Sequence, residues 1–243
     1  MLKKIVGAEI MKMRRSFLLF LHLIILILFP LAVGMYYGNR KDSITSASMV
    51  IIFFEILSIS SPILISIVVS SVFDREEKAG KFKNWLTEPV KKGIVVQDQL
   101  YYYWGLYGVE IIGTSLIYYL VLRLNSVNNV SFLKLIGVSI VFALCGLAQY
   151  ELAQCAALKW NIGGTLTIGF FGTVISLLSI TSLFDIVWPI IPWAWQMRLI
   201  TFWQPGISWD LIKLVMIEYL IPLIFTILII LFSKWYFNRW EGK

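Results

Sequence analysis

Apolar residues run along this chain in continuous blocks of about 20, separated by shorter polar stretches. A helix of that length, rising 1.5 Å per residue, crosses a hydrocarbon core about 30 Å thick. The blocks lack the alternation of apolar and polar positions that is typical of a membrane β-barrel. The pattern therefore predicts one all-α polytopic membrane domain over residues 1–243, with six transmembrane helices at Phe17–Tyr37, Ala47–Phe73, Leu100–Leu122, Phe132–Leu158, Gly163–Leu183 and Leu214–Phe232.

Residues 1–16 precede the first block and are rich in lysine and arginine. At 100° per residue, the apolar positions of this segment fall on one helical face and the cations on the others, which predicts a helix lying in the membrane interface. A secretory signal peptide is the competing interpretation. The apolar run Phe17–Val33 is longer than a usual signal core, and no clean A-x-A cleavage site follows it.

Composition and charge agree with a membrane domain, since 59% of the residues are hydrophobic and 14% are charged. With the N-terminus in the cytoplasm, 15 of the 21 lysines and arginines fall in cytoplasmic segments. Cytoplasmic loops carry the excess of basic residues, so both termini are predicted to be cytoplasmic. The net charge of +7 is attributed to this topology and to anionic lipid, and not to nucleic acid.

The stretch Asp74–Gln99 is the one long charged interval between apolar blocks. Its spacing predicts a short amphipathic helix that ends before Pro89, with facing pairs Asp74–Lys78 and Glu77–Lys81. An apolar stripe at i, i+3 and i+4 is formed by Phe82, Trp85 and Leu86. This segment is either a solvated loop with an interfacial helix or a docking element for a cytoplasmic partner.

The fifth connection, residues 185–210, is predicted to be external and is rich in tryptophan and proline. Tryptophan is enriched at membrane–water boundaries, because its ring is apolar and its N–H needs a partner. The connection is therefore either an aromatic belt on a partly re-entrant loop or a surface that meets an amphipathic ligand in the outer leaflet. The candidate contact residues are Trp193, Trp195 and Arg198.

Four carboxylates fall inside predicted spans: Glu55, Glu110, Glu151 and Glu218. A charge at the membrane centre costs about 2.5–3.5 kcal/mol on insertion scales, so such residues face the bundle interior or a wet cavity. They either line a translocation path or an inter-subunit contact, or they are protonated acids bonded to a neighbouring helix.

Motifs of enzymes and metal sites are absent from the sequence. His22 is the only histidine, which argues against a zinc site, and no G-x-x-x-x-G-K-[ST] loop is present to bind a nucleotide. The glutamates lie on four different spans and are expected to have no histidine partner. The sequence therefore predicts no catalytic residues, no bound metal and no cofactor in this chain.

Three segments together resemble the permease subunits of type-2 ABC exporters. They are the head Ala8–Ser16, the stretch Arg75–Pro89 (REEKAGKFKNWLTEP) and Pro192–Arg198 (PWAWQMR). The chain is most similar to the small permeases of lantibiotic-immunity and bacitracin-type peptide exporters. It departs from them at Gln97–Gln99, where the relatives tend to carry a lysine.

The resemblance implies that Asp74–Glu88 is a coupling helix seated in a separate ATP-binding subunit, present in two copies, that holds ATP and Mg²⁺. Its implied contact residues are Arg75, Glu76, Glu77, Gly80, Phe82, Trp85 and Leu86. It also implies a second permease chain, either a copy or a sister, and a location in the bacterial plasma membrane.

The function expected from this resemblance is export of a lantibiotic or similar antimicrobial peptide, as self-immunity or resistance. A type-2 permease for another substrate is the near alternative. A non-transporting membrane anchor and an intramembrane enzyme are the more distant ones.

Overall fold

The computed structural model describes residues 2–13, 16–82, 91–203, 213 and 217–240. These residues are all-α, with no strand among them. The longer helices are α1 (Leu2–Met13), α2 (Phe17–Leu23), α3 (Phe29–Gly38), α4 (Ser46–Lys78), α6 (Lys92–Leu124), α7 (Phe132–Leu178), α8 (Pro192–Arg198) and α10 (Leu220–Arg239). A π-helical turn, η1 (Ile24–Leu28), joins α2 to α3, and short 3-10 turns η2 (Ser182–Phe184), η3 (Trp188–Ile190) and η4 (Leu199–Trp203) flank α8.

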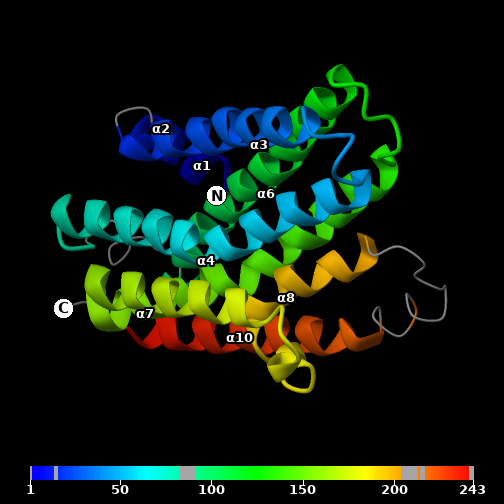
Figure 1. Ribbon diagram of the computed structural model, residues 1–243. Helices are drawn as coiled ribbons and strands as arrows, with labels where there is room; N and C mark the ends of the chain where they lie inside the picture. Colours follow the sequence, from blue (N-terminus) through cyan, green and yellow to red (C-terminus); the bar gives the residue numbers. More distant parts are fainter. Residues whose placement is uncertain (1, 14–15, 83–90, 204–212, 214–216, 241–243) are drawn as a thin grey trace.

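The helices pack side by side as an elongated bundle (Figure 1). The rod made by α2, η1 and α3 lies along one edge and α10 along the other, with α4 and α7 between them. The C-terminus, the end of α4 and the turn within α7 lie at one end, which we call the C-terminal end. The connections 39–45 and 125–131 lie at the opposite end.

Five helical stretches are long and apolar enough to cross a membrane: Phe17–Gly38, Ser46–Lys78, Lys92–Leu124, Phe132–Leu178 and Leu220–Arg239. The fourth, α7, contains both the fourth and the fifth predicted spans. Its 47 residues would extend about 70 Å as a straight helix, more than twice the thickness of a hydrocarbon core.

A break at Asn161 divides α7 into two parts that run in opposite directions (Figure 1). Asn161 has φ 59° and ψ −162°, outside the helical region, and asparagine tolerates positive φ better than most residues. Its carbonyl accepts a hydrogen bond from the Thr165 hydroxyl at 2.9 Å. The break thus returns the chain towards the opposite end without a long connection.

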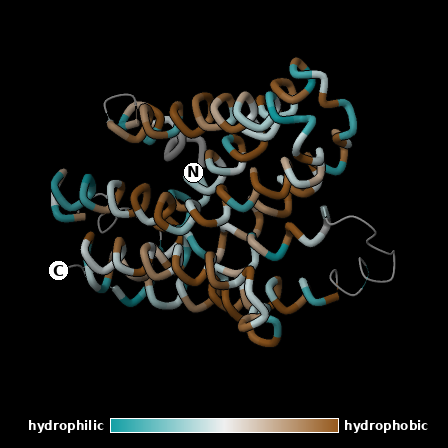
Figure 2. Tube along the Cα trace, in the orientation of Figure 1, coloured by the Kyte–Doolittle hydropathy of each residue, from teal (hydrophilic) through white to brown (hydrophobic). Residues whose placement is uncertain are grey.

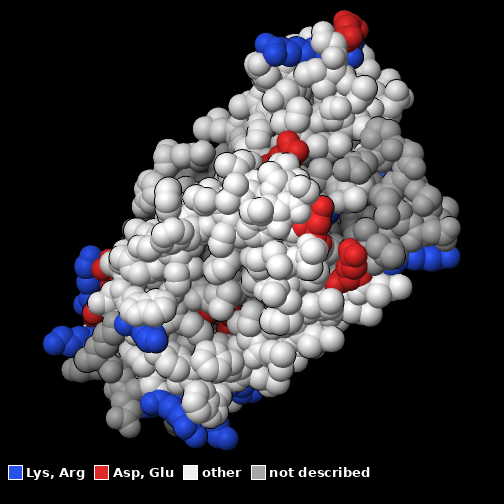
Figure 3. All heavy atoms as spheres, turned by 60° about the horizontal axis from the view of Figure 1, so that its bottom comes forward, with Lys and Arg blue, Asp and Glu red and all other residues white. Residues whose placement is uncertain are grey.

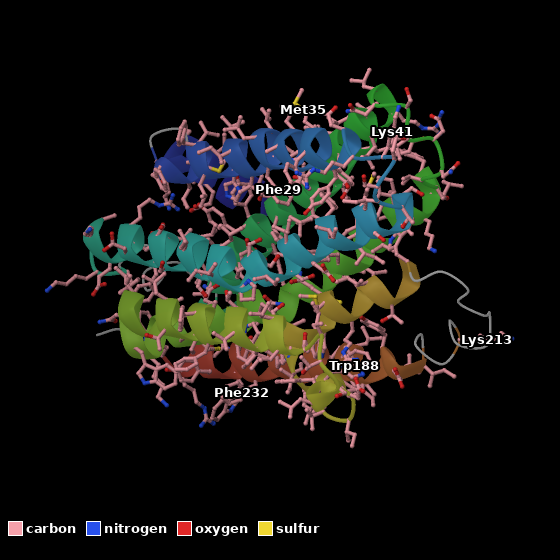
Figure 4. The ribbon with its side chains drawn as sticks, in the orientation of Figure 1. Phe29, Met35, Lys41, Trp188, Lys213 and Phe232 are labelled. Atoms are coloured by element: carbon pink, nitrogen blue, oxygen red, sulfur yellow. The ribbon has the colours of Figure 1, made fainter. Side chains whose placement is uncertain are left out.

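The outward face of the bundle is apolar. Figure 2 shows apolar residues through the middle of the helices and polar residues gathered towards their ends. Large side chains such as Met35 and Phe232, which are 58% and 56% exposed, point away from the bundle in Figure 4. A space-filling view shows a broad uncharged band between two charged ends, with a few acidic side chains inside the band (Figure 3). The surface therefore suits a lipid environment.

Aromatic packing joins three helices in the core. Phe53 of α4 stacks on Tyr118 of α6 with ring centroids 4.1 Å apart, and Phe29 of α3 stacks on Phe53 at 5.6 Å. The buried Tyr118 hydroxyl donates to the Met49 carbonyl at 2.8 Å. These contacts fix the relative positions of α3, α4 and α6.

Candidate functional site

The charged interval 74–99 is divided between two long helices. Its first residues end α4 at Lys78, and α6 begins at Lys92, so both helices extend beyond the predicted limits Phe73 and Leu100. At 33 residues each, α4 and α6 reach about 50 Å, which exceeds the hydrocarbon core. The described ends of the connection between them, residues 79–82 and 91, lie at the C-terminal end.

The prediction of one continuous helix over Asp74–Glu88 is wrong. Gly80, Lys81 and Phe82 have φ of 149°, 50° and 62°, so the chain leaves helical geometry directly after α4. The Asp74–Lys78 pair is confirmed at 2.7 Å. Lys81 lies past the helix end with φ 50°, and no Glu77–Lys81 ion pair forms among the described residues. Glycine at position 80 permits this sharp exit from the helix.

Phe82 folds back against the chain itself. It is 2% exposed, and its ring lies 4.8 Å from that of Phe73 and 5.1 Å from that of Trp240. This buried contact ties the start of the connection to the ends of α4 and α10. The other two residues of the predicted stripe, Trp85 and Leu86, lie outside the described residues, and their contact with a partner stays a prediction.

A buried cluster of charged and polar side chains lies beside this exit. Glu9 of α1 is 2% exposed and accepts hydrogen bonds from Lys12 at 2.9 Å, Arg75 at 2.5 Å and Tyr103 at 2.7 Å. Gln99 also donates to Glu9, at 2.9 Å. One carboxylate of α1 is therefore held by side chains from α4 and α6, which we call the Glu9 cluster.

Glu76 completes the Glu9 cluster. Lys12 contacts the Glu76 carboxylate at 2.6 Å, and Gln99 donates to it at 3.3 Å. Arg75 also donates to the Tyr103 hydroxyl at 2.9 Å. Two carboxylates thus face one lysine and one arginine, so the fully ionised cluster has no net charge.

The neighbouring cations set the ionisation of Glu9. Burial alone would raise the pKa of this carboxyl, but hydrogen bonds from Lys12 and Tyr103 and the charge of Arg75 hold its pKa below the ordinary value. Burial would lower the pKa of Lys12, but hydrogen bonds to Glu76 and Glu9 raise it above its ordinary value. Both shifts favour the charged forms.

Sequence reasoning missed Glu9. The sequence did offer one indication: Glu9 is the single acidic residue in the segment 1–16, which is otherwise rich in lysine and arginine. The structure also bears on Arg75 and Glu76, which the resemblance implies to be contact residues for the ATP-binding subunit. Both contact the Glu9 cluster within the chain, and the Glu76 side chain is only 1% exposed. Glu77 is half-buried and forms no side-chain hydrogen bond or ion pair with the Glu9 cluster in the described part of the chain.

The four intramembrane glutamates are not brought together. Glu110 contacts His22 Nδ1 at 2.8 Å, which corrects the expectation that no glutamate has a histidine partner. Glu151 accepts from the Ser233 hydroxyl of α10 at 2.5 Å. Glu218 is half-buried and has no hydrogen-bond partner among the described residues.

The His22–Glu110 pair lies beside the π-helical turn η1. His22 Nε2 and Glu110 Oε1 are buried without a partner in the described part of the chain. They border a small cavity of about 20 Å³, roughly room for one water. The turn η1 begins at Ile24, two residues after His22. It is π-helical, and the Phe29 N–H donates to the Ile24 carbonyl five residues earlier. Such turns are common at functional sites.

Glu55 lines an open hollow near the opposite end of the bundle. The hollow has a volume of about 180 Å³ and lies between α4 and the segment α8–η4. Arg198 lines it as well and is held by Asp185 at 2.7 Å. Two of the predicted contact residues, Glu55 and Arg198, are thus brought to one place.

The described part of the tryptophan-rich connection packs into the bundle. Trp188, Trp195 and Trp203 are 4%, 1% and 7% exposed, and Figure 4 shows Trp188 beside α10. Trp195 donates its indole N–H to the Pro189 carbonyl at 3.0 Å, and with 1% of its surface exposed it is not a surface residue. Trp193 is half-buried against Gly172. This arrangement favours the re-entrant interpretation over a surface lined with exposed tryptophans.

A polar network behind α8 explains its fixed position. Gln196 donates to the Tyr107 hydroxyl at 2.7 Å and to the Phe142 carbonyl at 3.0 Å. Gln149 donates to Gln196 at 3.2 Å, and Ser61 lies 2.9 Å from the Tyr107 hydroxyl. These bonds join α4, α6, α7 and α8 in the interior of the bundle.

Comparison with known proteins gives one assignment. The model of the family described as "ABC-2 family transporter protein" matches residues 5–191, more than three quarters of the chain. No curated protein and no solved structure matches the chain. The matched region contains the Glu9 cluster, the exit of the α4–α6 connection and the break at Asn161. With its several apolar helices, the chain is a multi-pass membrane protein that belongs to the ABC-2 transporter family, as a transport subunit that works with a separate ATP-binding subunit.

Proposed function

We propose that this chain is the membrane subunit of an ABC exporter that expels a lantibiotic or similar antimicrobial peptide from a bacterial plasma membrane. ATP and Mg²⁺ are bound by two copies of the separate ATP-binding subunit. A second permease chain, either a copy or a sister, completes the transporter. Both termini and the α4–α6 connection face the cytoplasm, and the break at Asn161 makes two spans of α7, giving six.

One observation carries the coupling role. The α4–α6 connection begins, at residues 79–82, beside the Glu9 cluster, whose side chains come from α1, α4 and α6. Because each of these helices holds part of the same buried ionic network, a displacement of the connection acts on all three at once. Phe82 adds a fourth attachment, to Trp240 beyond α10. ATP-driven movement of the partner would thus reach the spans through these contacts.

Residues of the segment 74–88 are proposed to have two different roles, one within the bundle and one at the partner interface. Arg75 and Glu76 hold the helices together, while Trp85 and Leu86 contact the ATP-binding subunit. Aromatic anchors dominate the binding free energy of many protein interfaces. ATP-driven closure of the partner can move the permease only if the partner's contacts favour one permease conformation over the other. Binding both conformations equally would cause no change.

The peptide substrate rests on the resemblance of the head, the charged stretch and the PWAWQMR segment to peptide-exporter permeases. A permease of the same class with another substrate is the alternative. Resistance measured across a panel of antimicrobial peptides, in cells with and without the gene, separates the two. Resistance that extends to no peptide in the panel would contradict peptide export but not membership of a transporter.

The coupling role is tested with Trp85→Ala. We expect binding of the ATP-binding subunit to weaken by about 2 kcal/mol or more if Trp85 is a hot spot, with loss of resistance. Trp160→Ala is the matched control, because Trp160 is an exposed tryptophan, 55% exposed, beside the break in α7. Equal co-purification of wild type and Trp85→Ala would remove the assigned role. Glu77→Lys is expected to have a smaller effect, under about 1 kcal/mol.

A membrane anchor without transport would also bind a cytoplasmic partner, but it predicts no nucleotide-dependent resistance. An intramembrane enzyme would need reactive groups gathered at one depth. The described contacts instead place the glutamates in separate surroundings, which supports the transporter over the enzyme.

A further inference from the structure

The hollow beside Glu55 differs from the interior cavities in size and access. The two cavities next to Tyr150 hold about 20 Å³ each, room for one water at most, whereas the Glu55 hollow holds about 180 Å³ and is open to the outside of the chain. Since a water molecule occupies roughly 30 Å³ of liquid, this space corresponds to about six waters. It is large enough for the polar group of an amphipathic molecule.

Glu55 carries the unbalanced charge of this hollow. It lies on α4 nine residues after Ser46, about 14 Å along the helix from its start. Among the described residues it has no ion-pair or hydrogen-bond partner. A carboxylate at such a depth in a membrane is unfavourable unless it is hydrated, protonated or paired with a cation.

Arg198 does not neutralise Glu55. Its Nη1 contacts Asp185 at 2.7 Å, and its Nη2 donates to the Thr181 carbonyl at 3.3 Å. Arg198 and Asp185 therefore balance each other, and among the described residues no further charged side chain lines the hollow. With Glu55 ionised, the described charges at the hollow, counted together with Asp185 on Arg198, sum to −1, which favours a cation.

The remaining lining suits an amine on an apolar chain. The half-buried Thr201 hydroxyl donates to the Arg198 carbonyl at 2.8 Å, and so its oxygen keeps a lone pair that can accept from an N–H. The other lining residues are apolar: Ile51, Ile180, Met197 and Ile200. A carboxylate with a hydroxyl acceptor nearby and an aliphatic wall together match an alkylammonium group.

The geometry points to a binding site for the primary ammonium group of an amphipathic molecule, with Glu55 as its counter-ion. The ammonium could come from the headgroup of an aminolipid or from the amine of a cationic peptide. Its role as a substrate site rests on the proposed function, whereas binding itself does not. In the proposed orientation this hollow faces the outer half of the membrane.

The test measures binding to the purified full-length chain in detergent, with dodecylamine as the probe and decanol as the uncharged comparison. We expect Glu55→Gln to weaken dodecylamine binding at least tenfold and to leave decanol binding unchanged. Glu55→Asp, which keeps the charge, should bind more tightly than Glu55→Gln. Asp42→Asn is the matched control, because it removes an exposed carboxylate at the same end of the bundle.

Two competition arms identify the source of the ammonium. Displacement of dodecylamine by phosphatidylethanolamine, but not by phosphatidylglycerol, assigns the site to a lipid headgroup. Displacement only by a lysine-rich amphipathic peptide assigns it to a peptide amine.

Equal dodecylamine affinity in wild type and Glu55→Gln would overturn the site. A change in oligomeric state without a change in amine affinity would overturn it too, because Glu55 would then belong to a contact between chains. Gel filtration and thermal unfolding of each variant show whether it is folded. Because the ATP-binding subunit is not needed for this experiment, its failure is distinct from failure of the proposed function.

Discussion

The carboxylates of Glu9 and Glu55 present opposite solutions to the same electrostatic problem. Both lie on helices of an apolar bundle, but Glu9 is 2% exposed and accepts bonds from four side chains, whereas Glu55 borders an open hollow without a partner among the described residues. A buried carboxylate is stable only where fixed donors replace water. Glu9 has those donors within the chain, and Glu55 does not.

The difference separates a structural role from a binding role. The donors around Glu9 come from three helices, so its charge holds the bundle together and leaves little capacity for a ligand. The charge of Glu55 holds nothing in the described chain and is free to meet a cation from outside. His22–Glu110 is an intermediate case, because within the described part of the chain Glu110 has a single partner and one unbonded oxygen.

Removal of the Glu9 charge is expected to have the largest effect. Glu9→Gln leaves Arg75 and Lys12 with Glu76 alone, and loss of one partner from a buried ionic network costs about 3–5 kcal/mol. The free energy of unfolding in mixed detergent micelles measures this loss. Glu77→Gln, at a half-buried glutamate on α4, is the control and should change it by under about 1 kcal/mol. Equal effects of the two variants would mean that the Glu9 cluster is not structural.

Replacement of His22 should have an intermediate effect. His22→Leu leaves the Glu110 carboxylate without its donor, and an unsatisfied buried polar group costs about 1–3 kcal/mol. His22→Gln, whose amide can still donate, should recover part of the loss in the same unfolding measurement. If both variants are equally unstable, the packing of α2 matters here and the hydrogen bond does not.

The stability of the Glu9 cluster should depend on pH at both extremes. The folded-state pKa of Glu9 is depressed, so its contribution is present above the unfolded value near 4.5 and is lost as pH falls through the folded pKa. The folded-state pKa of Lys12 is raised, so its contribution is present below the unfolded value near 10.5 and is lost as pH rises through the folded pKa. The thermal unfolding midpoint should therefore decrease at acid pH, where Glu9 is protonated, and at alkaline pH, where Lys12 is deprotonated. Glu9→Gln should reduce the decrease at acid pH. An unchanged acid dependence in Glu9→Gln would assign it to other groups.

The smallest effect on stability is expected at Glu55. Because the Glu55 charge makes no described contact, Glu55→Gln should change the free energy of unfolding by about 0.5 kcal/mol or less while abolishing most amine binding. A loss of several kcal/mol would show that Glu55 is structural and would remove the contrast with Glu9.

Hydrophobic patterning predicted the helical membrane fold, because apolar blocks of spanning length have few alternatives. It placed the helix boundaries less well. Lys78 and Lys92 lie in the charged interval and were placed outside the predicted spans, yet α4 and α6 extend out of the apolar band to include them. The break at Asn161 was expected as a short connection near Lys159, and the positive φ of a single asparagine creates it.

The contacts of the candidate site could not be read from the sequence. Glu9, Arg75 and Tyr103 are far apart in the chain, and only the packing of α1 against α4 and α6 brings them together. The same holds for His22 and Glu110, which are 88 positions apart. Glu55 and Arg198 were both candidates from their residue types, but their shared hollow depends on how α8 folds back into the bundle.

The most direct test is purification of the tagged chain from its native membrane in mild detergent, with identification of every protein that accompanies it. Our account predicts an ATP-binding subunit in stoichiometric amount together with a second permease, which is either another copy of this chain or a sister. Trp85→Ala should lose the ATP-binding subunit and keep the second permease. A chain that purifies alone, and stays alone after crosslinking in the membrane, would contradict its role as an exporter subunit.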